Sequence, residues 1–492
     1  MTDDVERPNK RHRTTVNYTI FMNSENDEDE DSSSDFILSE DEESDDESDD
    51  ESDEESDDES EEESEDEPKQ PSNINIFKNL LNNNLFDATL NTEELKYFKT
   101  LDNESQKTLL NKIKEVSEYD NDFIPYRIKI VNTSMPIKYK SIAYNKLNML
   151  NTLEPGGGEY YKQKKWLDAY LKIPFNNYKE TPCSIEKNNI QECRNYMKNC
   201  KKIMDDCVYG MDDAKSQIIQ MIGQWVTNPT TIGQSIAIQG PMGTGKTTLV
   251  KEGISKALGR DFEFISLGGV SDGSYLDGHS YTYEGSIWGK IVETLIHCKS
   301  MNPVIYFDEL DKVSDTAKGE EIIGILTHLT DTSQNSSFTD KYFSEVDLDM
   351  SRCLFIFSYN DESKVNPILK DRMFKVQTKG YNNKDKITIS NQYLIPTISD
   401  RIHFKKGDII FSDSTIEYII NEYTDKEKGV RNLKRAIETI YSKLNIFRLM
   451  GNETLFNNEI KNVEFPCLIT TDIIKKLINK NEKNFSHTMM YI

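Results

Sequence analysis

The fold of this chain is decided by residues 235–248, which read Ser235-Ile236-Ala237-Ile238-Gln239-Gly240-Pro241-Met242-Gly243-Thr244-Gly245-Lys246-Thr247-Thr248. Residues 235–239 form an apolar run that predicts a buried strand, and a helical pattern begins at Thr248. Between them lies the pattern GxxxxGK[ST], a Gly-rich turn that joins a strand to a helix. The backbone N–H groups of such a turn and the helix N-terminus bind phosphate. The stretch therefore predicts a P-loop.

The residues of this turn have predicted roles at a bound nucleotide. Lys246 is expected to reach the β- and γ-phosphates, and the Thr247 hydroxyl is expected to ligate Mg²⁺. The predicted cofactors are therefore ATP and Mg²⁺. An ordinary Gly-rich turn is the alternative, which the flanking strand and helix disfavour. The other residues expected to contact the nucleotide are Gly240, Pro241, Met242, Gly243, Thr244, Gly245 and Thr248.

A second apolar run, residues 304–307, ends in the acidic pair Asp308-Glu309. Two carboxylates at the end of a buried strand are costly to desolvate unless a cation lies nearby. We expect Asp308 to hold Mg²⁺ through water and Glu309 to orient or deprotonate the attacking water. A helix N-cap is the alternative use of such a pair. Together with the P-loop, the pair predicts nucleotide hydrolysis.

Three further residues are candidates for contacts to the γ-phosphate. Asn360 follows a third apolar run, residues 353–358, and its amide can bind both the γ-phosphate and the attacking water. Arg372, in Asp371-Arg372-Met373, and Arg431, in Gly429-Val430-Arg431, each supply a spare cation that is a candidate to meet the γ-phosphate. Asn after a strand is more often a turn residue, and single arginines are more often surface charges, so the pattern alone leaves these roles open.

The charge of the chain is concentrated near its N-terminus. Residues 25–67 hold 29 acidic and no basic residues, and because the whole chain carries −27, the rest carries +2. We expect residues 1–70 to be disordered, since so polar a segment buries too little apolar surface to fold. The segment is either a polyanion that binds basic proteins or a solubilising tail, and Lys10–Arg13 is a weak nuclear signal. Serines followed three positions later by an acidic residue make it a candidate for phosphorylation: Ser44, Ser48, Ser52, Ser56, Ser60 and Ser64.

The remaining sequence divides into three predicted parts. Residues 71–200 have helical patterns, interrupted at 154–158, and form a helical N-terminal region. Residues 201–380 alternate apolar runs with helical patterns, which predicts an α/β domain with a parallel sheet sandwiched by helices. Residues 381–492 are predicted to form a small all-α domain and the C-terminal end.

Composition excludes several classes of protein. No apolar window of about 18 residues exists, so we expect no membrane span, and the first residues lack the apolar core of a secretory signal. Seven cysteines in 492 residues make no disulfide framework. We expect an intracellular, reducing compartment, the cytoplasm or the nucleus.

Several stretches resemble the ATPase part of the Lon family, within the AAA+ superfamily. The likeness covers roughly residues 100–480. The stretches that carry it are Lys165–Asp168, Ile173–Phe175, Tyr209–Met211, Leu258–Arg260, Phe264–Val270, Gly278–His279, Tyr281–Gly285, Asp308–Lys312, Gln334–Phe338, Tyr393–Pro396 and Gly429–Leu433. The resemblance implies an AAA+ core with a helical lid and a homo-hexameric ring.

The resemblance also implies roles for individual residues. Tyr209 and Gly210 would pack on the adenine, and Asn360 would be the sensor beside the acidic pair. Arg372 would be an arginine finger that reaches the neighbouring subunit's site, and Arg431 would be a second sensor in the lid.

A loop of residues 283–285 would line the central pore by the same resemblance. Tyr283 would grip an extended polypeptide with its ring, and Gly285 would follow in the turn. Glu284 departs from the family, which has an aliphatic residue there. We therefore expect weaker grip on apolar substrates or a preference for basic ones.

The Lon family also carries a protease domain of about 200 residues with a Ser–Lys dyad after its lid. Here the small domain is predicted to end near Ile478, and no Ser-bearing motif like that of Lon appears, so we expect no peptide cleavage. The leading hypothesis is an ATP-driven ring that unfolds or remodels unfolded or tagged proteins. One alternative is the ATPase component of a protease whose peptidase is a separate chain. The other is a DNA- or chromatin-associated factor, although no basic run with interleaved aromatics supports nucleic-acid binding.

Overall fold

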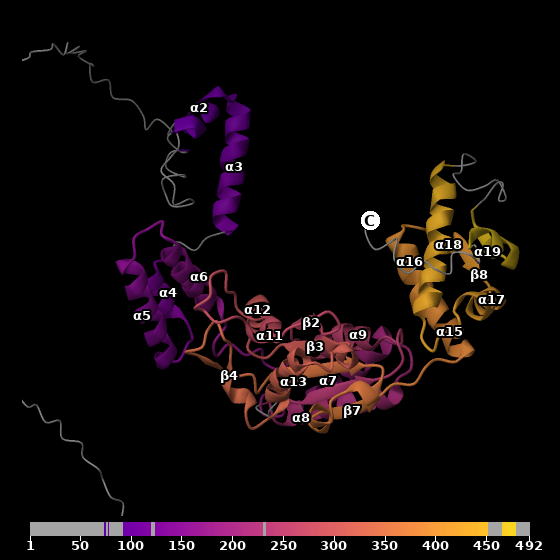
Figure 1. Cartoon of the computed structure of the whole chain (residues 1–492). Helices are drawn as coiled ribbons and strands as arrows, with labels where there is room; N and C mark the ends of the chain where they lie inside the picture. The colour runs from indigo at the N-terminus through magenta and orange to yellow at the C-terminus, as the bar shows by residue number, and fades with distance from the viewer. Residues whose placement is uncertain are drawn as a thin grey trace, which may run out of the picture. The chain divides into compact units, whose positions relative to one another are not determined.

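A computed structural model describes residues 73–74, 77, 92–119, 124–229, 233–450 and 465–478. The chain divides into two compact units, residues 1–115 and 116–492, and their helices and strands are labelled in Figure 1. The predictions for the acidic segment 1–70 lie outside the described residues. Among the described residues, no helix combines the length and the apolar character needed to cross a bilayer.

Among its described residues, the first unit contains α2 (Thr92–Thr100) and most of α3 (Asn103–Tyr119). Phe77 stacks on Phe98 with the ring centroids 4.0 Å apart, and Leu110 of α3 packs on the same small cluster. The Gln106 side-chain amide donates to the carbonyl oxygens of Phe98 and Leu101, at 3.1 and 3.0 Å. These two bonds join the turn after α2 to α3.

The second unit is built on a five-stranded parallel sheet with the strand order β2-β3-β6-β1-β7. The predicted strand 235–239 is confirmed to the residue, and the predicted runs 304–307 and 353–358 differ by one residue at their ends. Because all strands are parallel, β1, β3 and β6 end at the same edge. The strands are β1 (Ser235–Gln239), β2 (Phe262–Ser266), β3 (Val304–Asp308), β6 (Leu354–Tyr359) and β7 (Phe374–Gln377).

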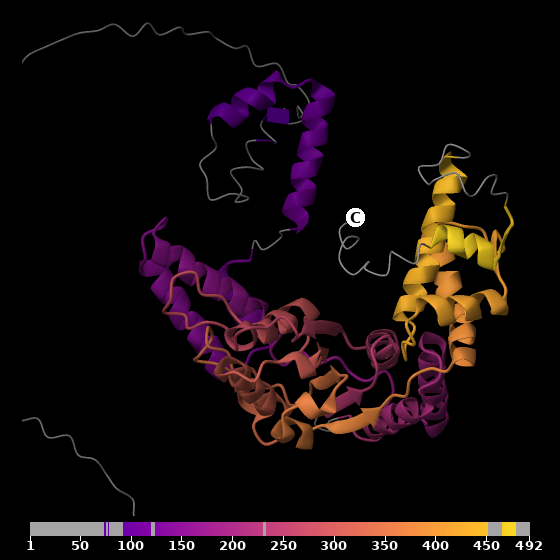
Figure 2. The ribbon, with the colours of Figure 1, turned by 45° about the vertical axis from the view of Figure 1, so that its right-hand side comes forward.

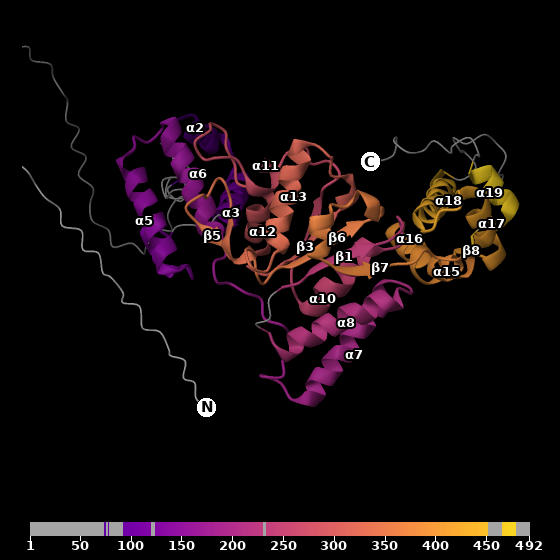
Figure 3. The same cartoon turned by 60° about the horizontal axis from the view of Figure 1, so that its bottom comes forward.

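Alternate residues of the strands point to opposite faces of the sheet, as the pleat requires. Ile236 and Tyr306 pack under α7 (Ile190–Cys207), α8 (Asp212–Thr227) and the helix after the P-loop. Ala237 and Phe307 pack under α11 (Ser274–Asp277), α12 (Lys290–Cys298) and α13 (Ala317–Thr330). Figure 3 shows the two helix layers on either side of the sheet. The predicted sandwich is therefore confirmed.

Short elements complete the core. The helix after the P-loop is continuous and has a π-helical middle. Its parts are α9 (Lys246–Thr248), η2 (Leu249–Ser255) and α10 (Lys256–Leu258). The others are η3 (Leu310–Lys312), η4 (Asn335–Ser337), β4 (Phe338–Thr339), β5 (Asp347–Leu348), η5 (Glu362–Lys364) and α14 (Pro367–Asp371).

Three helices before α7 pack against the α12–α13 side of the core: α4 (Tyr126–Asn132), α5 (Ile137–Thr152) and α6 (Gly158–Lys172). Trp166 of α6 is 2% exposed. Its indole N–H donates to the carbonyl oxygen of Tyr342 at 3.2 Å, and its ring lies 5.4 Å from that of Phe343. The α4–α6 region and the sheet thus share one hydrophobic cluster.

The lid follows β7 and is helical (Figure 2). Contrary to the all-α prediction, it also contains a parallel strand pair, β8 (Ile409–Phe411) and β9 (Cys467–Ile469). Strands of three residues, so far apart in sequence, give no alternating pattern to detect. The lid helices are α15 (Asn383–Ile389), η6 (Ser390–Leu394), α16 (Ile395–Arg401), α17 (Asp413–Tyr423), α18 (Arg431–Met450) and α19 (Thr471–Leu477).

We predict that Trp166→Ala lowers the free energy of unfolding by about 3–5 kcal/mol, because it removes a buried aromatic ring and leaves a cavity. Urea unfolding of the full chain, followed by circular dichroism, measures the change. The control is Tyr161→Ala on the same helix, where the side chain is 56% exposed and the expected change is within about 0.5 kcal/mol. Equal effects of the two substitutions would contradict the shared core.

Candidate nucleotide-binding site

The candidate site begins where β1 ends and the P-loop turns into α9. Gly243 and Gly245 have φ angles of +72° and +95°, which side chains rarely adopt. These conformations let the loop curl around a space at the N-terminus of the following helix. The local structure is the phosphate cradle that the sequence predicts.

Lys246 is the central cation of the site. Its ammonium donates to the carbonyl oxygens of Gly240 and Pro241, at 2.6 and 3.2 Å, and to Asn360 Oδ1 at 2.8 Å. Burial lowers the pKa of Lys246, while the charges of Asp308 and Asp311 oppose that shift. The structure thus joins the P-loop to the predicted sensor Asn360 through one side chain.

Thr247 and Asp308, the predicted Mg²⁺ ligands, both line the same cavity. The Thr247 hydroxyl lies 3.3 Å from the hydroxyl of Tyr306 on β3. Asp308 Oδ1 accepts hydrogen bonds from the Ser358 hydroxyl and from the Glu309 backbone N–H. Asp308 is therefore held at the end of β3 by Glu309, which follows it in the chain, and by Ser358 of β6.

Glu309 adopts a left-handed conformation, with φ at +61°. Such a conformation in a non-glycine residue is strained and is concentrated at functional sites. Its carboxylate lies against Gly268, where an added Cβ would be 2.1 Å from Glu309 Oε2. Only glycine at 268 allows the carboxylate this position.

Asp311 is a site residue that sequence reasoning did not single out. Its Oδ2 accepts hydrogen bonds from the backbone N–H groups of Asn360 and Asp361, at 3.3 and 3.1 Å. The side chain is buried. Asp311 therefore fixes the turn that carries Asn360. The sequence feature that could have identified Asp311 is its position two residues after Glu309.

The lid meets the P-loop directly. The Val430 backbone N–H donates to the Gly243 carbonyl oxygen at 3.0 Å. Glu427 caps the N-terminus of α18 by accepting from the backbone N–H groups of Arg431 and Asn432, at 3.1 and 2.7 Å. Arg431 consequently stands at the start of α18 and lines the cavity.

Tyr381, at the junction of the core and the lid, is a second site residue that was not predicted from the sequence. Its hydroxyl lies 2.8 Å from the Thr244 carbonyl oxygen and 3.1 Å from that of Tyr209. Burial raises the pKa of Tyr381 above its ordinary value. Tyr381 ties the P-loop to the segment predicted to pack on adenine.

These residues enclose a cavity of about 630 Å³. Gly210, Gly240 and Pro241 do not line it, although Lys246 contacts the last two. The predicted residues that line it are Tyr209, Met242, Gly243, Thr244, Gly245, Lys246, Thr247, Thr248, Asp308, Glu309, Asn360 and Arg431. Lining residues that the sequence analysis missed are Cys207, Val208, Tyr381, Ile389, Tyr393, Leu394, Thr397, Ile398, Val430 and Lys434.

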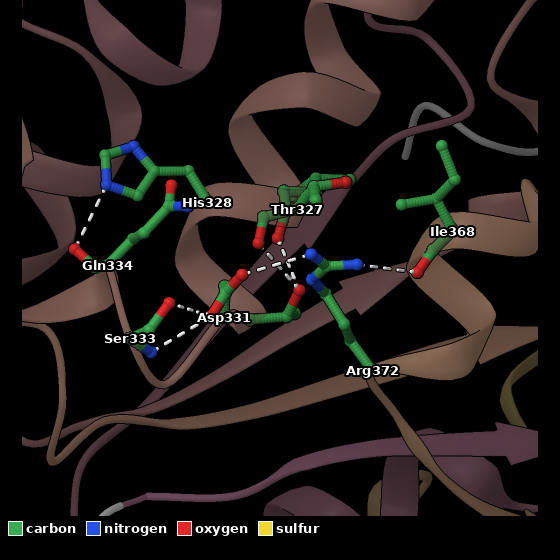
Figure 4. Close-up of polar contacts among 9 residues, drawn as sticks. Thr327, His328, Asp331, Ser333, Gln334, Ile368 and Arg372 are labelled. Carbon is green, nitrogen blue, oxygen red and sulfur yellow. Dashed lines mark hydrogen bonds and ion pairs between the residues drawn. The ribbon is translucent and has the colours of Figure 1, made fainter.

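Arg372 is not among the residues that line this cavity. Figure 4 shows its guanidinium beside Asp331 and Ile368. Its guanidinium pairs with Asp331 Oδ2 at 3.0 Å and donates to the Ile368 carbonyl oxygen at 3.3 Å. Hydrogen bonds from Ser333, together with Arg372, lower the pKa of Asp331 to about 2. Arg372 and the P-loop of the same chain are therefore not brought together.

The predicted pore residues lie on a loop of residues 278–289, called the Tyr283 loop here. Tyr283 is 68% exposed, and its backbone N–H closes a turn by donating to the Ser280 carbonyl oxygen at 3.1 Å. Glu284 is also exposed, and Gly285 has φ at +72°. The loop thus presents an aromatic ring and a carboxylate to solvent.

The donor set fits a nucleoside triphosphate with Mg²⁺. A buried ammonium, the curled backbone and a helix N-terminus suit phosphate oxygens, and an adjacent hydroxyl and carboxylate suit a hard divalent cation. The size of the cavity is within the range of small-molecule sites. Lys246, Thr247 and Asp308 are the residues that would hold the phosphates and the metal ion.

Comparison with protein families agrees with this geometry. Residues 236–381 match the ATPase family associated with various cellular activities (AAA), and residues 401–455 match the Lon protease AAA+ ATPase lid domain. The chain belongs to the Lon family of AAA+ ATPases. The family match covers both the P-loop core and the lid that encloses the cavity.

Individual relatives carry Lon names. The chain is 35% identical over 359 residues to a Lon protease homolog of Acanthamoeba polyphaga mimivirus, which is 71% of this chain and 34% of the relative. It is 32% identical over 342 residues to Lon protease 2 of Bdellovibrio bacteriovorus, 69% of this chain and 41% of the relative. A mitochondrial Lon protease homolog of Aspergillus niger is 31% identical over 332 residues, which is 67% of this chain and 28% of the relative. The chain thus spans between about a quarter and two fifths of these relatives' lengths.

We predict that Tyr381→Phe in this Lon-family chain weakens nucleotide binding about two- to tenfold, because the P-loop loses one hydrogen bond. Titration with a fluorescent ATP analogue measures the affinity. Tyr393→Phe is the matched control, since that hydroxyl also lies by the cavity but donates to Asp205 of α7. Unchanged affinity in Tyr381→Phe would contradict the role of the hydroxyl.

Proposed function

We propose that this chain hydrolyses ATP in a ring of identical subunits and uses the energy to draw protein chains through the centre of the ring. The observation that carries the proposal is the meeting of Lys246, Asp308, Glu309 and Asn360 around one cavity closed by the lid. Family membership supports the ATPase, and the exposed Tyr283 loop supports the action on polypeptides.

In the proposed reaction, Lys246 neutralises charge on the phosphates while the P-loop backbone fixes their position. Asn360 lies within hydrogen-bond distance of Lys246, so a phosphate oxygen bound to Lys246 is also within reach of the amide. Glu309 accepts a proton from the water that attacks the γ-phosphate. Mg²⁺, held by Thr247 and by Asp308 through water, would supply further positive charge at the phosphate oxygens.

The lid is the proposed route by which hydrolysis becomes movement. Val430 bonds the P-loop, and Arg431 faces the cavity from the N-terminus of α18. A change in charge at the phosphates therefore acts on both Arg431 and the helix end. The lid would rotate with the state of the nucleotide.

In the proposed ring, Arg372 of the neighbouring subunit adds a further cation to those that line the cavity of one chain, Lys246, Arg431 and Lys434. The salt bridge with Asp331 holds the guanidinium on the core surface, away from its own P-loop. A guanidinium held in this position is suited to contact the nucleotide of the neighbouring subunit, as an arginine finger does. Hexameric assembly is the predicted arrangement.

Substrate contact is assigned to the tip of the Tyr283 loop. An exposed aromatic ring packs on any extended chain without reading its sequence, while the adjacent Glu284 favours basic segments. We infer that unfolded proteins with basic stretches are bound better than acidic ones.

We predict that Glu309→Gln retains ATP binding and lowers turnover about 10²- to 10⁴-fold, because the water loses its base. Phosphate release measures turnover, and the titration described above measures binding. Turnover equal to that of the wild type would remove Glu309 from the reaction.

We predict that Arg372→Ala lowers turnover about 10³-fold or more without loss of binding, as for an arginine finger. Mixing Arg372→Ala with Glu309→Gln should recover activity, because a Glu309→Gln subunit still supplies the cation to an otherwise intact neighbouring site. Activity of the mixture no greater than the mean of the two variants would contradict a site completed in trans.

Proteolysis is a second candidate, favoured by the protease names of the relatives. Incubation of the purified chain with casein and ATP distinguishes the two candidate functions, the threading ATPase and the protease. Intact casein with stimulated ATPase supports the motor, and ATP-dependent fragments support the protease.

A further inference from the structure

The base of the Tyr283 loop is closed tightly. Gly278 and Gly289 approach so closely that a Cβ at Gly289 would lie 2.6 Å from the Gly278 nitrogen. The His279 N–H donates to the Ile287 carbonyl oxygen at 3.1 Å, and the Gly289 N–H donates to the fully buried Asp340 at 2.8 Å. The two arms of the loop therefore leave the core at one fixed point.

Beyond this base, the two arms of the loop contact α5 and α6. The ring of Tyr281, two residues before the exposed Tyr283, is flanked by the ammonium groups of Lys146 and Lys162, at 5.5 and 4.8 Å from its centroid. On the other arm, the Lys165 ammonium lies 5.7 Å from the centroid of Trp288. The loop is thus supported from outside the AAA+ core.

Gln163 makes the most specific of these contacts. Its side chain is 6% exposed, so its amide must find partners within the protein. The amide nitrogen donates to the Lys146 carbonyl oxygen of α5 at 3.2 Å, and Oε1 accepts from the Tyr281 hydroxyl at 2.8 Å. One buried side chain therefore joins α5, α6 and the arm of the loop.

We propose that Gln163 is a positioning residue for substrate grip, and that it acts through Tyr281 to hold Tyr283 at a fixed height above α6. The inference rests on the proposed function of the Tyr283 loop. Trp166 of α6 donates to the Tyr342 carbonyl oxygen, and the rings of Tyr281 and Trp288 on the two arms pack edge-on against the Tyr342 ring, so α6 and both arms of the loop share one support. A displacement of α6 then changes the grip on the substrate without touching the nucleotide cavity.

The test uses the full chain, unfolded casein and two measurements, the basal ATPase rate and the casein concentration for half-maximal stimulation. Gln163→Leu and Tyr281→Phe should each raise that concentration about two- to tenfold, the range for one lost hydrogen bond. The basal rate should stay within about twofold, because neither residue lines the nucleotide cavity. The double variant should be no worse than Gln163→Leu alone, since both substitutions delete the bond from the Tyr281 hydroxyl to Gln163.

Tyr126→Phe is the matched control. Its hydroxyl donates to Asp168 Oδ1 at 2.6 Å and joins α4 to α6. Hydrogen exchange of residues 280–286 should accelerate in Gln163→Leu and Tyr281→Phe and remain unchanged in Tyr126→Phe. Equal half-stimulating concentrations in the wild type and Tyr281→Phe, or additive effects in the double variant, would overturn the inference.

Tyr283→Ala separates this inference from the function on which it rests. Loss of stimulation in Tyr283→Ala, with no change in Tyr281→Phe, overturns the role of Gln163 alone. Unchanged stimulation in Tyr283→Ala overturns the proposed threading and the role of Gln163 with it.

Discussion

The ammonium group of Lys246 joins the parts of this molecule that the proposed reaction needs. It bonds two carbonyl oxygens of the P-loop and the side chain of Asn360, which follows β6. That meeting is possible because β1 and β6 are adjacent and parallel, so their ends lie at one edge of the sheet. The buried ammonium of Lys246 is stable only while its three acceptor oxygens keep their positions at that edge of the sheet. The sheet register is therefore the constraint on which the site depends.

The same constraint extends to the lid. Val430 and Glu427 place the N-terminus of α18 against Gly243, so the lid contacts the loop that surrounds the phosphates. The Tyr381 hydroxyl adds a second contact at the junction. A helix end and a cation at the cavity respond to the charge they face. The arrangement gives the proposed motor a short physical path from the phosphates to the lid.

Sequence reasoning predicted the parts of the site that are local in the chain. The P-loop and the pair Asp308-Glu309 were found because each follows its own apolar strand, and the structure brings both to one cavity. The roles of Arg372 and Arg431 came from family resemblance alone and remain predictions.

Other features depended on contacts between distant segments. Asp311, Tyr381 and Gln163 act through partners 49, 137 and 118 residues away, and no local pattern reveals such pairs. The strand pair β8–β9 was not predicted for the same reason, because its two strands lie far apart in the sequence. Periodicity reports which face of an element is buried, and it contains no information on which distant backbone group a polar side chain will meet.

The central claim is that one cavity between the P-loop and the lid binds a nucleoside triphosphate with Mg²⁺. A structure determined with a slowly hydrolysed ATP analogue and Mg²⁺ tests it most directly. The account predicts the triphosphate along residues 240–247, with Lys246, Thr247 and Asp308 around the phosphates and the metal ion, and with Arg431 on the lid side. An analogue bound elsewhere, or a cavity filled by protein side chains in its presence, would contradict it.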